Sequence, residues 1–319
     1  MSAASQGRGQ LQVFSGTANP ELAGKIAAHL GVPLGGMTVS KFPDGETCVR
    51  IDTSVRGKDA YIVQPTCPPV NDNLVELLII LDALRRASAS RITAVIPYYG
   101  YARQDKKTAG REPIAARMVA DMLTTGGADR IVTVDLHSPQ IQGFFDIPVD
   151  HLTAVGVLAE HLRKSDLTGS VIVAPDAGRV NMATDYANRL GLPVVIIHKR
   201  RIGPEETEAV YVVGDVAGKR PIIIDDMVTT GGTISRSVRA LLDEGAAPPM
   251  RVAVTHGVLV GKAVEYLSED VILEAAVTDT VPIGAEKAFD RLKVVSIAPL
   301  IAEAIRRIHA DSSVSELFS

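Results

Sequence analysis

The stretch that decides the fold is IIIDDMVTTGGT, residues 222–233. Its apolar β-branched start predicts a buried strand, which ends in the carboxylates Asp225 and Asp226. The small residues that follow let backbone N–H groups converge on an anion at the start of the next predicted helix. The stretch therefore predicts a binding site for a sugar phosphate, in which the carboxylates accept hydrogen bonds from vicinal hydroxyls of the sugar. The simpler alternative is an acidic turn with an ordinary threonine N-cap.

The rest of the chain alternates short apolar runs with helical patterns. Predicted strands span residues 60–63, 92–96, 130–134, 171–173, 194–197, 221–224, 252–255 and 293–296. Predicted helices span residues 20–30, 73–86, 113–124, 153–163, 181–190, 233–244 and 299–309, and Gly31, Gly126 and Gly191 are predicted as left-handed caps. Such alternation predicts an α/β fold with parallel sheets flanked by helices.

Three pairs of segments recur at one offset of about 160 residues, which suggests an internal duplication. Residues 57–63 (GKDAYIV) resemble 218–224 (GKRPIII), and residues 30–33 (LGVP) resemble 190–193 (LGLP). The pattern RxxAV at residues 91–95 returns one residue shorter at 251–254. We therefore expect two tandem domains, residues 1–150 and 151–319. Since only the second has the carboxylate pair and the glycine turn, we expect the sugar phosphate there.

Composition excludes several other classes of protein. The chain has 319 residues, of which 46% are hydrophobic and 22% charged, as is ordinary for a globular protein of about two domains. A net charge of −4 and 4% aromatic residues argue against a nucleic-acid binder. The two cysteines, Cys48 and Cys67, form no Cys-x-x-Cys motif and fit a reducing cytosol. We expect a cytoplasmic protein without a membrane segment, because the apolar run at residues 75–84 is too short to span a bilayer.

Standard ATP-binding loops are absent from the sequence. The segment GVLVGK, residues 257–262, has the wrong spacing for a P-loop and continues into Ala263. Residues 103–111 hold four cations, which suit a polyphosphate or form a solvated loop. Taken alone, FPDGE (residues 42–46) predicts a plain turn and HKRR (residues 198–201) a solvated hairpin tip.

Taken together and in order, these motifs resemble the ribose-phosphate pyrophosphokinase family, whose two domains have the type I phosphoribosyltransferase fold. The resemblance covers roughly residues 13–308 and includes FSGTANP (14–20), FPDGE (42–46), YARQDKK (101–107), DLHS (135–138), PDAG (175–178), HKRR (198–201) and the loop from Asp225. It implies two tandem phosphoribosyltransferase-like domains. It also implies transfer of the β,γ-diphosphoryl group of Mg–ATP to the anomeric hydroxyl of ribose 5-phosphate, which gives 5-phosphoribosyl 1-diphosphate and AMP for nucleotide biosynthesis.

The resemblance further implies a Mg²⁺ cofactor, a homo-oligomer (a hexamer built from dimers) and a set of site residues. These residues are Phe42, Asp44, Glu46, Arg103 and Gln104 for ATP; His137 and Asp176 for Mg²⁺; Lys199 and Arg201 for catalysis; and Arg201, Asp225, Asp226, Thr229, Thr230, Gly231, Gly232 and Thr233 for ribose 5-phosphate. Imidazole is a poor ligand for Mg²⁺, so His137 is expected to act largely through a bound water. The family usually has an acidic residue where this chain has Thr229.

Three alternatives share part of this pattern. A nucleotide-forming phosphoribosyltransferase would share residues 225–233 but would not need the segments at 42–46 and 103–104. A non-catalytic regulatory paralogue, or a structural subunit, should have lost the carboxylate pair or the loop around Lys199, and both are present in the sequence. Formation of AMP from ATP and ribose 5-phosphate separates these alternatives from the main interpretation.

Overall fold

The computed structural model describes residues 9–200 and 209–317 and divides the chain into two compact units. Unit 1 contains the described residues up to Thr153, together with Thr280–Pro282 and those from Ser296 onward. Unit 2 contains Ala154–Asp279 and Ile283–Val295. The chain first crosses between the units close to the predicted boundary. The predicted second domain, residues 151–319, differs from unit 2 because the C-terminal helix returns to unit 1.

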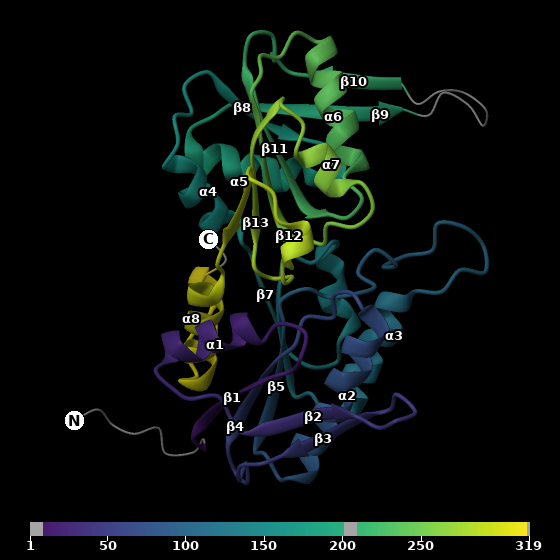
Figure 1. Ribbon diagram of the computed structural model, residues 1–319, viewed down its shortest axis with the longest axis vertical. Helices are drawn as coiled ribbons and strands as arrows, with labels where there is room; N and C mark the ends of the chain where they lie inside the picture. Colours follow the sequence, from purple (N-terminus) through teal and green to yellow (C-terminus); the bar gives the residue numbers. More distant parts are fainter. Residues whose placement is uncertain (1–8, 201–208, 318–319) are drawn as a thin grey trace. The chain divides into compact units, whose positions relative to one another are not determined.

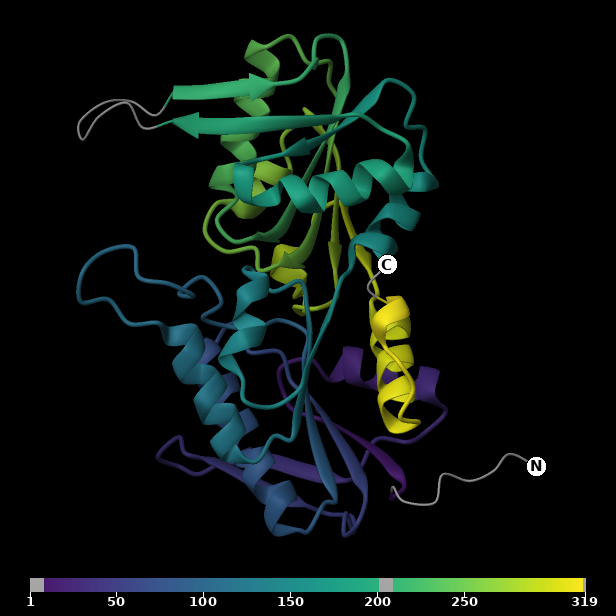
Figure 2. The same ribbon diagram turned by 180° about the vertical axis from the view of Figure 1, so that it is seen from behind.

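Unit 1 is built on a parallel sheet of order β1-β4-β5-β6-β7. Its strands are β1 (Leu11–Ser15), β4 (Asp59–Val63), β5 (Arg91–Ile96), β6 (Arg130–Val134) and β7 (Val149–Leu152). Helices α1 (Pro20–Leu30) and α8 (Ala298–His309) lie on one face of the sheet, and α2 (Val70–Arg86) and α3 (Ala115–Gly126) on the other (Figures 1 and 2). The antiparallel strands β2 (Met37–Lys41) and β3 (Thr47–Ile51) form a separate hairpin beside α2, and the short helices are η1 (Pro139–Phe144) and η4 (Ser315–Leu317).

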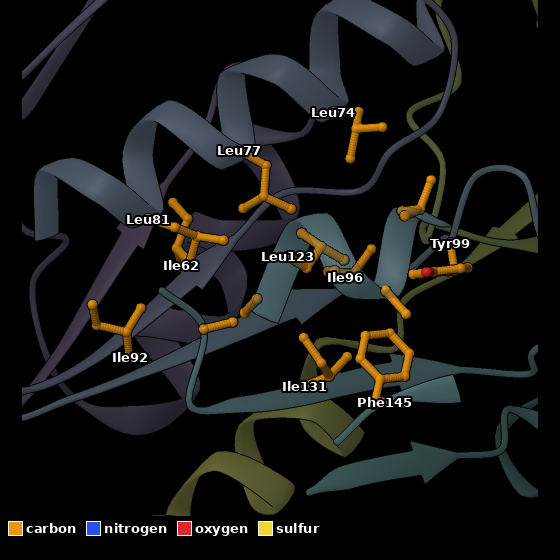
Figure 3. Close-up of a cluster of buried hydrophobic side chains, with 14 of the residues drawn as sticks. Ile62, Leu74, Leu77, Leu81, Ile92, Ile96, Tyr99, Leu123, Ile131 and Phe145 are labelled. Atoms are coloured by element: carbon orange, nitrogen blue, oxygen red, sulfur yellow. The ribbon is translucent and has the colours of Figure 1, made fainter. Parts of the chain in front are cut away.

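Figure 3 shows the core between this sheet and the pair α2 and α3. Leucines of the two helices meet isoleucines of the strands: Leu74, Leu77, Leu81 and Leu123 against Ile62, Ile92, Ile96 and Ile131. The rings of Tyr99 and Phe145 close one end of this core in an edge-to-face contact with centroids 5.9 Å apart. Because helices cover both faces, the strands are apolar without alternation, as is typical of buried parallel sheets.

Unit 2 is built on a sheet of order β10-β9-β8-β11-β12-β13-β14, in which only the pair β9 and β10 is antiparallel. Its strands are β8 (Ser170–Ala174), β9 (Val194–Arg200), β10 (Ala209–Val213), β11 (Arg220–Val228), β12 (Met250–Gly257), β13 (Ile272–Thr278) and β14 (Leu292–Val295). Helices α4 (Val155–Arg163) and α5 (Val180–Leu190) cover one face, and α6 (Gly232–Asp243) and α7 (Ala263–Leu267) the other (Figures 1 and 2). The short helices are η2 (Ala177–Arg179) and η3 (Ala285–Lys287).

The two units repeat one architecture. The order β1-β4-β5-β6-β7 of unit 1 matches β8-β11-β12-β13-β14 of unit 2. The turns that enter β4 and β11 are also alike, since Gly57 and Gly218 have φ angles of 70° and 67°. Lys58 N–H donates to the Val55 carbonyl at 2.9 Å, and Lys219 N–H donates to the Val216 carbonyl at 3.0 Å. The predicted pair of tandem α/β domains is therefore confirmed.

The predicted strands and helices are all present, with two differences that concern the argument below. The strand predicted at residues 221–224 continues to Val228, because β12 pairs with it as far as Gly257. The cap of α3 is Gly127, with φ of 118°, so the prediction of Gly126 is wrong by one residue. Strands β1, β2, β3, β7, β10 and β13 were not predicted.

In the described part of the chain, no helix combines the length and the apolar character needed to cross a membrane.

Candidate functional site

Asp225 and Asp226 lie within a strand rather than in an exposed turn. The neighbouring strand β12 keeps β11 extended at this point, with Asp225 opposite Val254 and Met227 opposite His256. The two aspartates are only 8% and 1% exposed. Ionised groups buried to this degree need charged or hydrogen-bonding partners. The simple alternative of an acidic surface turn is therefore wrong.

The partner of both carboxylates is Arg179, at the end of η2. Its Nε donates to Asp225 Oδ1 and its Nη2 to Asp226 Oδ1, each at 2.9 Å. The backbone N–H of Asp226 also donates to Asp225 Oδ1 at 2.9 Å. The sequence analysis missed Arg179, although it directly follows the motif PDAG at residues 175–178. One guanidinium thus faces two carboxylates, and the group keeps a surplus of negative charge.

Burial and charge change the acidity of this group. Burial, followed by the neighbouring charge of Asp226, raises the pKa of Asp225 well above that of an ordinary aspartate, while Arg179 acts in the opposite direction. Burial would lower the pKa of Arg179, but the two carboxylates outweigh burial and raise it. The ionised form of Asp225 is therefore disfavoured, and hydrogen-bond donors of a ligand would stabilise it.

The glycine turn after β11 forms a cradle in front of Asp225. Helix α6 begins at Gly232, and its N-cap residue Gly231 has φ of 76° and provides no side-chain cap. The first N–H groups of α6 therefore lack the partner that a threonine N-cap would give, and such groups are a ready anion site. A pocket of about 40 Å³ lies at this point, lined by Asp225, Met227, Val228, Thr229, Thr230, Gly231, Gly232, Thr233 and Ile234. The pocket thus includes Asp225 and all of the predicted residues from Thr229 to Thr233, and Asp226 shares the partner Arg179 with Asp225.

A second loop, residues 258–260, holds this turn in place through backbone hydrogen bonds. The N–H groups of Val258 and Leu259 donate to the Val228 carbonyl at 3.0 and 3.1 Å, and Val260 N–H donates to the Thr229 carbonyl at 2.8 Å. Lys287 Nζ in turn donates to the Val258 carbonyl at 3.0 Å. The segment GVLVGK, whose spacing excludes a P-loop, therefore holds the backbone of Val228 and Thr229 in place at the start of the glycine turn. Sequence reasoning missed this role because it depends on pairing between distant strands.

The residues predicted for ATP lie on two segments of unit 1. Phe42, Asp44 and Glu46 share the turn between β2 and β3, where Phe42 N–H donates to the Glu46 carbonyl at 2.8 Å. The ring of Phe42 is 51% exposed. Arg103 and Gln104 are exposed on the loop after β5, where Gln104 N–H donates to the Tyr101 carbonyl at 2.9 Å. The predicted turn at residues 42–46 is confirmed, and it leaves an aromatic ring and two carboxylates accessible on one tip.

The two residues predicted for the metal belong to different units. His137 follows β6 in unit 1, and the preceding N–H of Leu136 donates to His151 Nε2 at 2.8 Å. Asp176 follows β8 in unit 2, where its Oδ1 accepts a hydrogen bond from Gly178 N–H at 2.8 Å. Across residues 9–200 and 209–317, no cluster of three or more His, Cys, Asp or Glu side chains could hold a metal ion. Mg²⁺ that binds together with nucleotide phosphates typically takes several of its ligands from the substrate.

The residues predicted for catalysis are only partly described. The backbone of Lys199 lies in β9, opposite Val210 of β10. The side chain of Lys199, and all of Arg201, lie outside the described residues.

Comparison with known proteins gives one consistent result. Residues 11–127 match the family model for the N-terminal domain of ribose phosphate pyrophosphokinase, and residues 200–319 match the phosphoribosyl synthetase-associated domain. The chain is 51% identical over 310 residues to a ribose-phosphate pyrophosphokinase of Caldanaerobacter subterraneus subsp. tengcongensis, covering 97% of this chain and 98% of that protein. It is 50% identical over 310 residues to one of Gloeobacter violaceus, covering 97% and 93% of the two chains. The crystal structure of phosphoribosylpyrophosphate synthetase from Mycobacterium smegmatis superposes with a TM-score of 0.87 at 49% identity, covering 95% of this chain and 100% of that one. With this likeness over almost its whole length, the chain belongs to the ribose-phosphate pyrophosphokinase family.

Proposed function

We propose that this protein transfers the β,γ-diphosphoryl group of Mg–ATP to the anomeric hydroxyl of ribose 5-phosphate, giving 5-phosphoribosyl 1-diphosphate and AMP. Membership of the family makes the chain a diphosphate-transferring enzyme. The observation that carries the proposal is the pair Asp225 and Asp226, held by Arg179 next to the uncapped N-terminus of α6. This arrangement suits a ligand with hydroxyl donors at one end and a phosphate at the other.

Ribose 5-phosphate has this distribution of groups. Its phosphate enters the pocket at residues 227–234, where the N–H groups of the first turn of α6 and the threonine hydroxyls donate to it. Its hydroxyls donate to Asp225, whose burial makes added donors favourable. Asp226 lies deeper and, through Arg179, keeps the orientation of Asp225.

ATP is assigned to the segments of unit 1. The exposed ring of Phe42 stacks on adenine, and Asp44 and Glu46 on the same turn accept hydrogen bonds from amino groups. Arg103 and Gln104 contact the nucleotide, the guanidinium because it can bind phosphate oxygens in bidentate fashion. The support for this assignment is that each set lies on one short loop and is accessible.

In the reaction, the anomeric oxygen attacks the β-phosphorus and forms a new P–O bond. The bond between the β-phosphorus and the oxygen bridging to the α-phosphorus breaks, and AMP leaves with that oxygen. The hydroxyl proton is released to solvent. Positioning and neutralisation of charge provide most of the catalysis in transfers of this kind. Lys199 and Arg201 are proposed to stabilise the charge on the bridging and equatorial oxygens.

Mg²⁺ is proposed to enter as part of Mg–ATP, with His137 and Asp176 holding its complex. The carboxylate of Asp176 uses Oδ1 for the Gly178 N–H, which fixes its orientation. Bound Mg²⁺ neutralises phosphate charge in such transfers.

We also propose a cytoplasmic homo-oligomer. Both cysteines are free thiols, which fits a reducing compartment. The resemblance to the family implies a hexamer built from dimers, and the half-exposed Phe42 fits a residue that completes its contacts on a ligand or a second copy. Mass measurement in solution tests the assembly.

The function is tested by incubating the protein with ATP and ribose 5-phosphate and measuring AMP. The proposal expects AMP and 5-phosphoribosyl 1-diphosphate in equal amounts, and none when ribose 5-phosphate is omitted. Substitution Lys199→Ala should lower turnover by about 10²–10³, as removal of a preorganised charge-stabilising donor does. If AMP does not form, but 5-phosphoribosyl 1-diphosphate and a base give a nucleotide, the alternative phosphoribosyltransferase activity replaces this proposal.

A further inference from the structure

We propose that Arg236, one turn into α6, is a further residue that binds the phosphate of ribose 5-phosphate. The inference rests on the proposed function and adds to it a residue that lies outside the loop at residues 225–233. It is carried by three observations: the charge of the pocket, the position of the guanidinium, and the lack of another partner for it.

The charge of the pocket calls for a cation. A phosphate monoester has a charge of about −1.5 to −2 near neutral pH. Among the described residues, those that line the pocket include one acidic residue, Asp225, and no basic one. Arg179 is occupied by the two carboxylates. The N-terminus of α6 contributes the equivalent of only about half a positive charge. Besides Arg201, which is assigned to ribose 5-phosphate above, a further positive group at the edge of the pocket would therefore offset the remaining charge of the phosphate.

The guanidinium of Arg236 lies at that edge. Arg236 follows Gly232 by four residues, and side chains in a helix point back towards its N-terminus, so the two positions share one face. Its Nη1 lies 3.5 Å from the place where a Cβ on Gly232 would be. Gly232 itself lines the phosphate pocket. Because glycine has no side chain, nothing of residue 232 separates this guanidinium from the pocket.

The guanidinium is also available. Within the part of the chain that the structure describes, the side chain of Arg236 is exposed and makes no hydrogen bond or ion pair. Of the unit 2 arginines whose side chains are described, Arg163, Arg179, Arg189, Arg220 and Arg291 form ion pairs. An unpaired guanidinium beside an anion pocket is suited to bidentate binding of phosphate oxygens.

The experiment compares two arginines of the same helix. Arg236→Ala should raise the KM for ribose 5-phosphate about tenfold, which corresponds to the loss of a charge-assisted hydrogen bond at a partly exposed site. The KM for ATP, kcat and the unfolding midpoint should stay unchanged. Arg236→Lys should recover part of the affinity, because it keeps the charge and loses the bidentate geometry. Arg239→Ala is the matched control, since Arg239 is equally exposed and lies almost a further turn along α6.

The outcomes separate this inference from the proposed function. If the unaltered protein forms no AMP from ATP and ribose 5-phosphate, the proposed function fails, and the inference fails with it. If the unaltered protein is active but Arg236→Ala keeps the same KM for ribose 5-phosphate, only the role of Arg236 is overturned. The same holds if Arg239→Ala raises that KM as much, or if Arg236→Ala raises the KM for both substrates equally. Such results would indicate general electrostatics or a structural effect rather than a phosphate contact.

Discussion

Asp225 and Asp226 can remain inside the sheet because Arg179 reaches both of them from a neighbouring loop. Its two nitrogens each make a 2.9 Å contact, and the side chains of Arg179 and Asp226 are only 12% and 2% exposed. The arrangement sets one guanidinium against two buried carboxylates, which is costly for the fold and useful for a ligand rich in hydroxyl donors. The site thus has a stability cost that ribose 5-phosphate is expected to offset on binding.

Arg179→Met tests this account at the level of a residue. Removing one partner of a buried ion pair leaves uncompensated charge, so the free energy of unfolding should fall by about 3 kcal/mol at neutral pH. The pKa of Asp225 is already raised above its unfolded value, so its contribution to stability is present at low pH and is lost as the pH rises through the folded pKa. Without Arg179 that pKa rises further, so the loss in free energy of unfolding caused by Arg179→Met should grow with pH. Denaturant unfolding of both proteins at several pH values measures this loss.

The matched control is Arg189→Met. Arg189 forms a partly buried pair with Asp185 one helical turn away, at 3.0 Å, in the same unit. Pairs of that kind contribute less than about 1 kcal/mol. Equal losses for the two variants, or a deficit for Arg179→Met that does not change with pH, would contradict the central role of the buried carboxylates.

The cradle depends on elements that surround it as well as on its own residues. Gly231 has a positive φ of 76°, and a Cβ there would lie 3.0 Å from Ala263 Cα and 3.1 Å from the ring of Tyr266. Helix α7 therefore fits against the turn only if residue 231 has no side chain. The loop at residues 258–260 fixes the other side of the turn through its N–H groups. The cradle is thus held between two elements that belong to a later part of the chain.

Gly231→Ala is the prediction for this element. A left-handed φ costs a residue with a Cβ about 1–2 kcal/mol, and the contact with α7 must in addition displace the turn. We expect lower stability and a KM for ribose 5-phosphate raised by at least about tenfold, since a displacement near 1 Å at a binding turn has effects of this order or larger. Gly218→Ala is the matched control. It has the same strain, with φ of 67°, but no atom lies within 4 Å of its Cβ position. It should lose stability without a change in KM, and a similar change in KM for both variants would refute the argument.

The elements show which parts of the fold a sequence can predict. Strands such as β4 and β5 were predicted because they are buried and largely apolar, without a polar alternation. The strand β13 was missed, because Glu274 interrupts its apolar pattern where the residue pairs with His161 at 2.8 Å. The hairpin of β2 and β3 was missed as well, since its residues are half-exposed and its stability comes from packing on α2.

The residues of the candidate site also divide into those that a sequence pattern can predict and those that it cannot. The residues of the cradle are local in sequence, and the pattern from Asp225 to Thr233 was sufficient to predict them. Arg179 contacts Asp225 across 46 residues of chain and Val260 contacts Thr229 across 31, so no local pattern indicates them. The left-handed cap of α3 was misplaced by one position because two glycines adjoin, and only the hydrogen bonds of the last turn select Gly127.

At the scale of the whole molecule, the C-terminal helix completes the repeat in unit 1. In unit 2, α4 packs beside α5, which follows the first strand of the parallel set. In unit 1 the helix after the first strand is α1, and its neighbour is α8, as Figures 1 and 2 both show. The contact of α8 is reinforced at its end, where His309 Nδ1 lies 2.8 Å from Asp59 Oδ2 at the start of β4. The helix that precedes the parallel strands in unit 2 is α4, whereas its counterpart in unit 1 is α8, from the C-terminal part of the chain. A division of the sequence into two halves could not predict this difference.

The repeat also gives unit 1 a counterpart of the phosphate pocket, with different chemistry. Gln64 occupies the position of Asp225, and its Nε2 donates to Glu76 Oε1 at 2.9 Å. The backbone N–H and the hydroxyl of Thr17 also donate to Glu76, at 2.7 and 2.6 Å. The turn that enters α2 contains Pro68 and Pro69, which have no N–H to offer an anion. A pocket of about 310 Å³ lies at this turn, but the donors of Thr17 that line it are directed to Glu76, and Lys41 is paired with Asp72.

Unit 1 should therefore not bind ribose 5-phosphate, and each chain should bind a single molecule of it. Calorimetric titration in the presence of Mg²⁺ and a non-hydrolysable ATP analogue should give a stoichiometry of one per chain. Two substitutions, one at each pocket, sharpen the test, because Thr230 lines the pocket of unit 2 and Thr17 that of unit 1. Thr230→Ala should raise the KM for ribose 5-phosphate several-fold through loss of a hydrogen bond to a charged group. Thr17→Ala should lower the stability of unit 1 and leave this KM unchanged, since its hydroxyl serves Glu76. A second equivalent of bound ribose 5-phosphate, abolished by Thr17→Ala, would show that the pocket of unit 1 has kept the function that its prolines and Glu76 argue against.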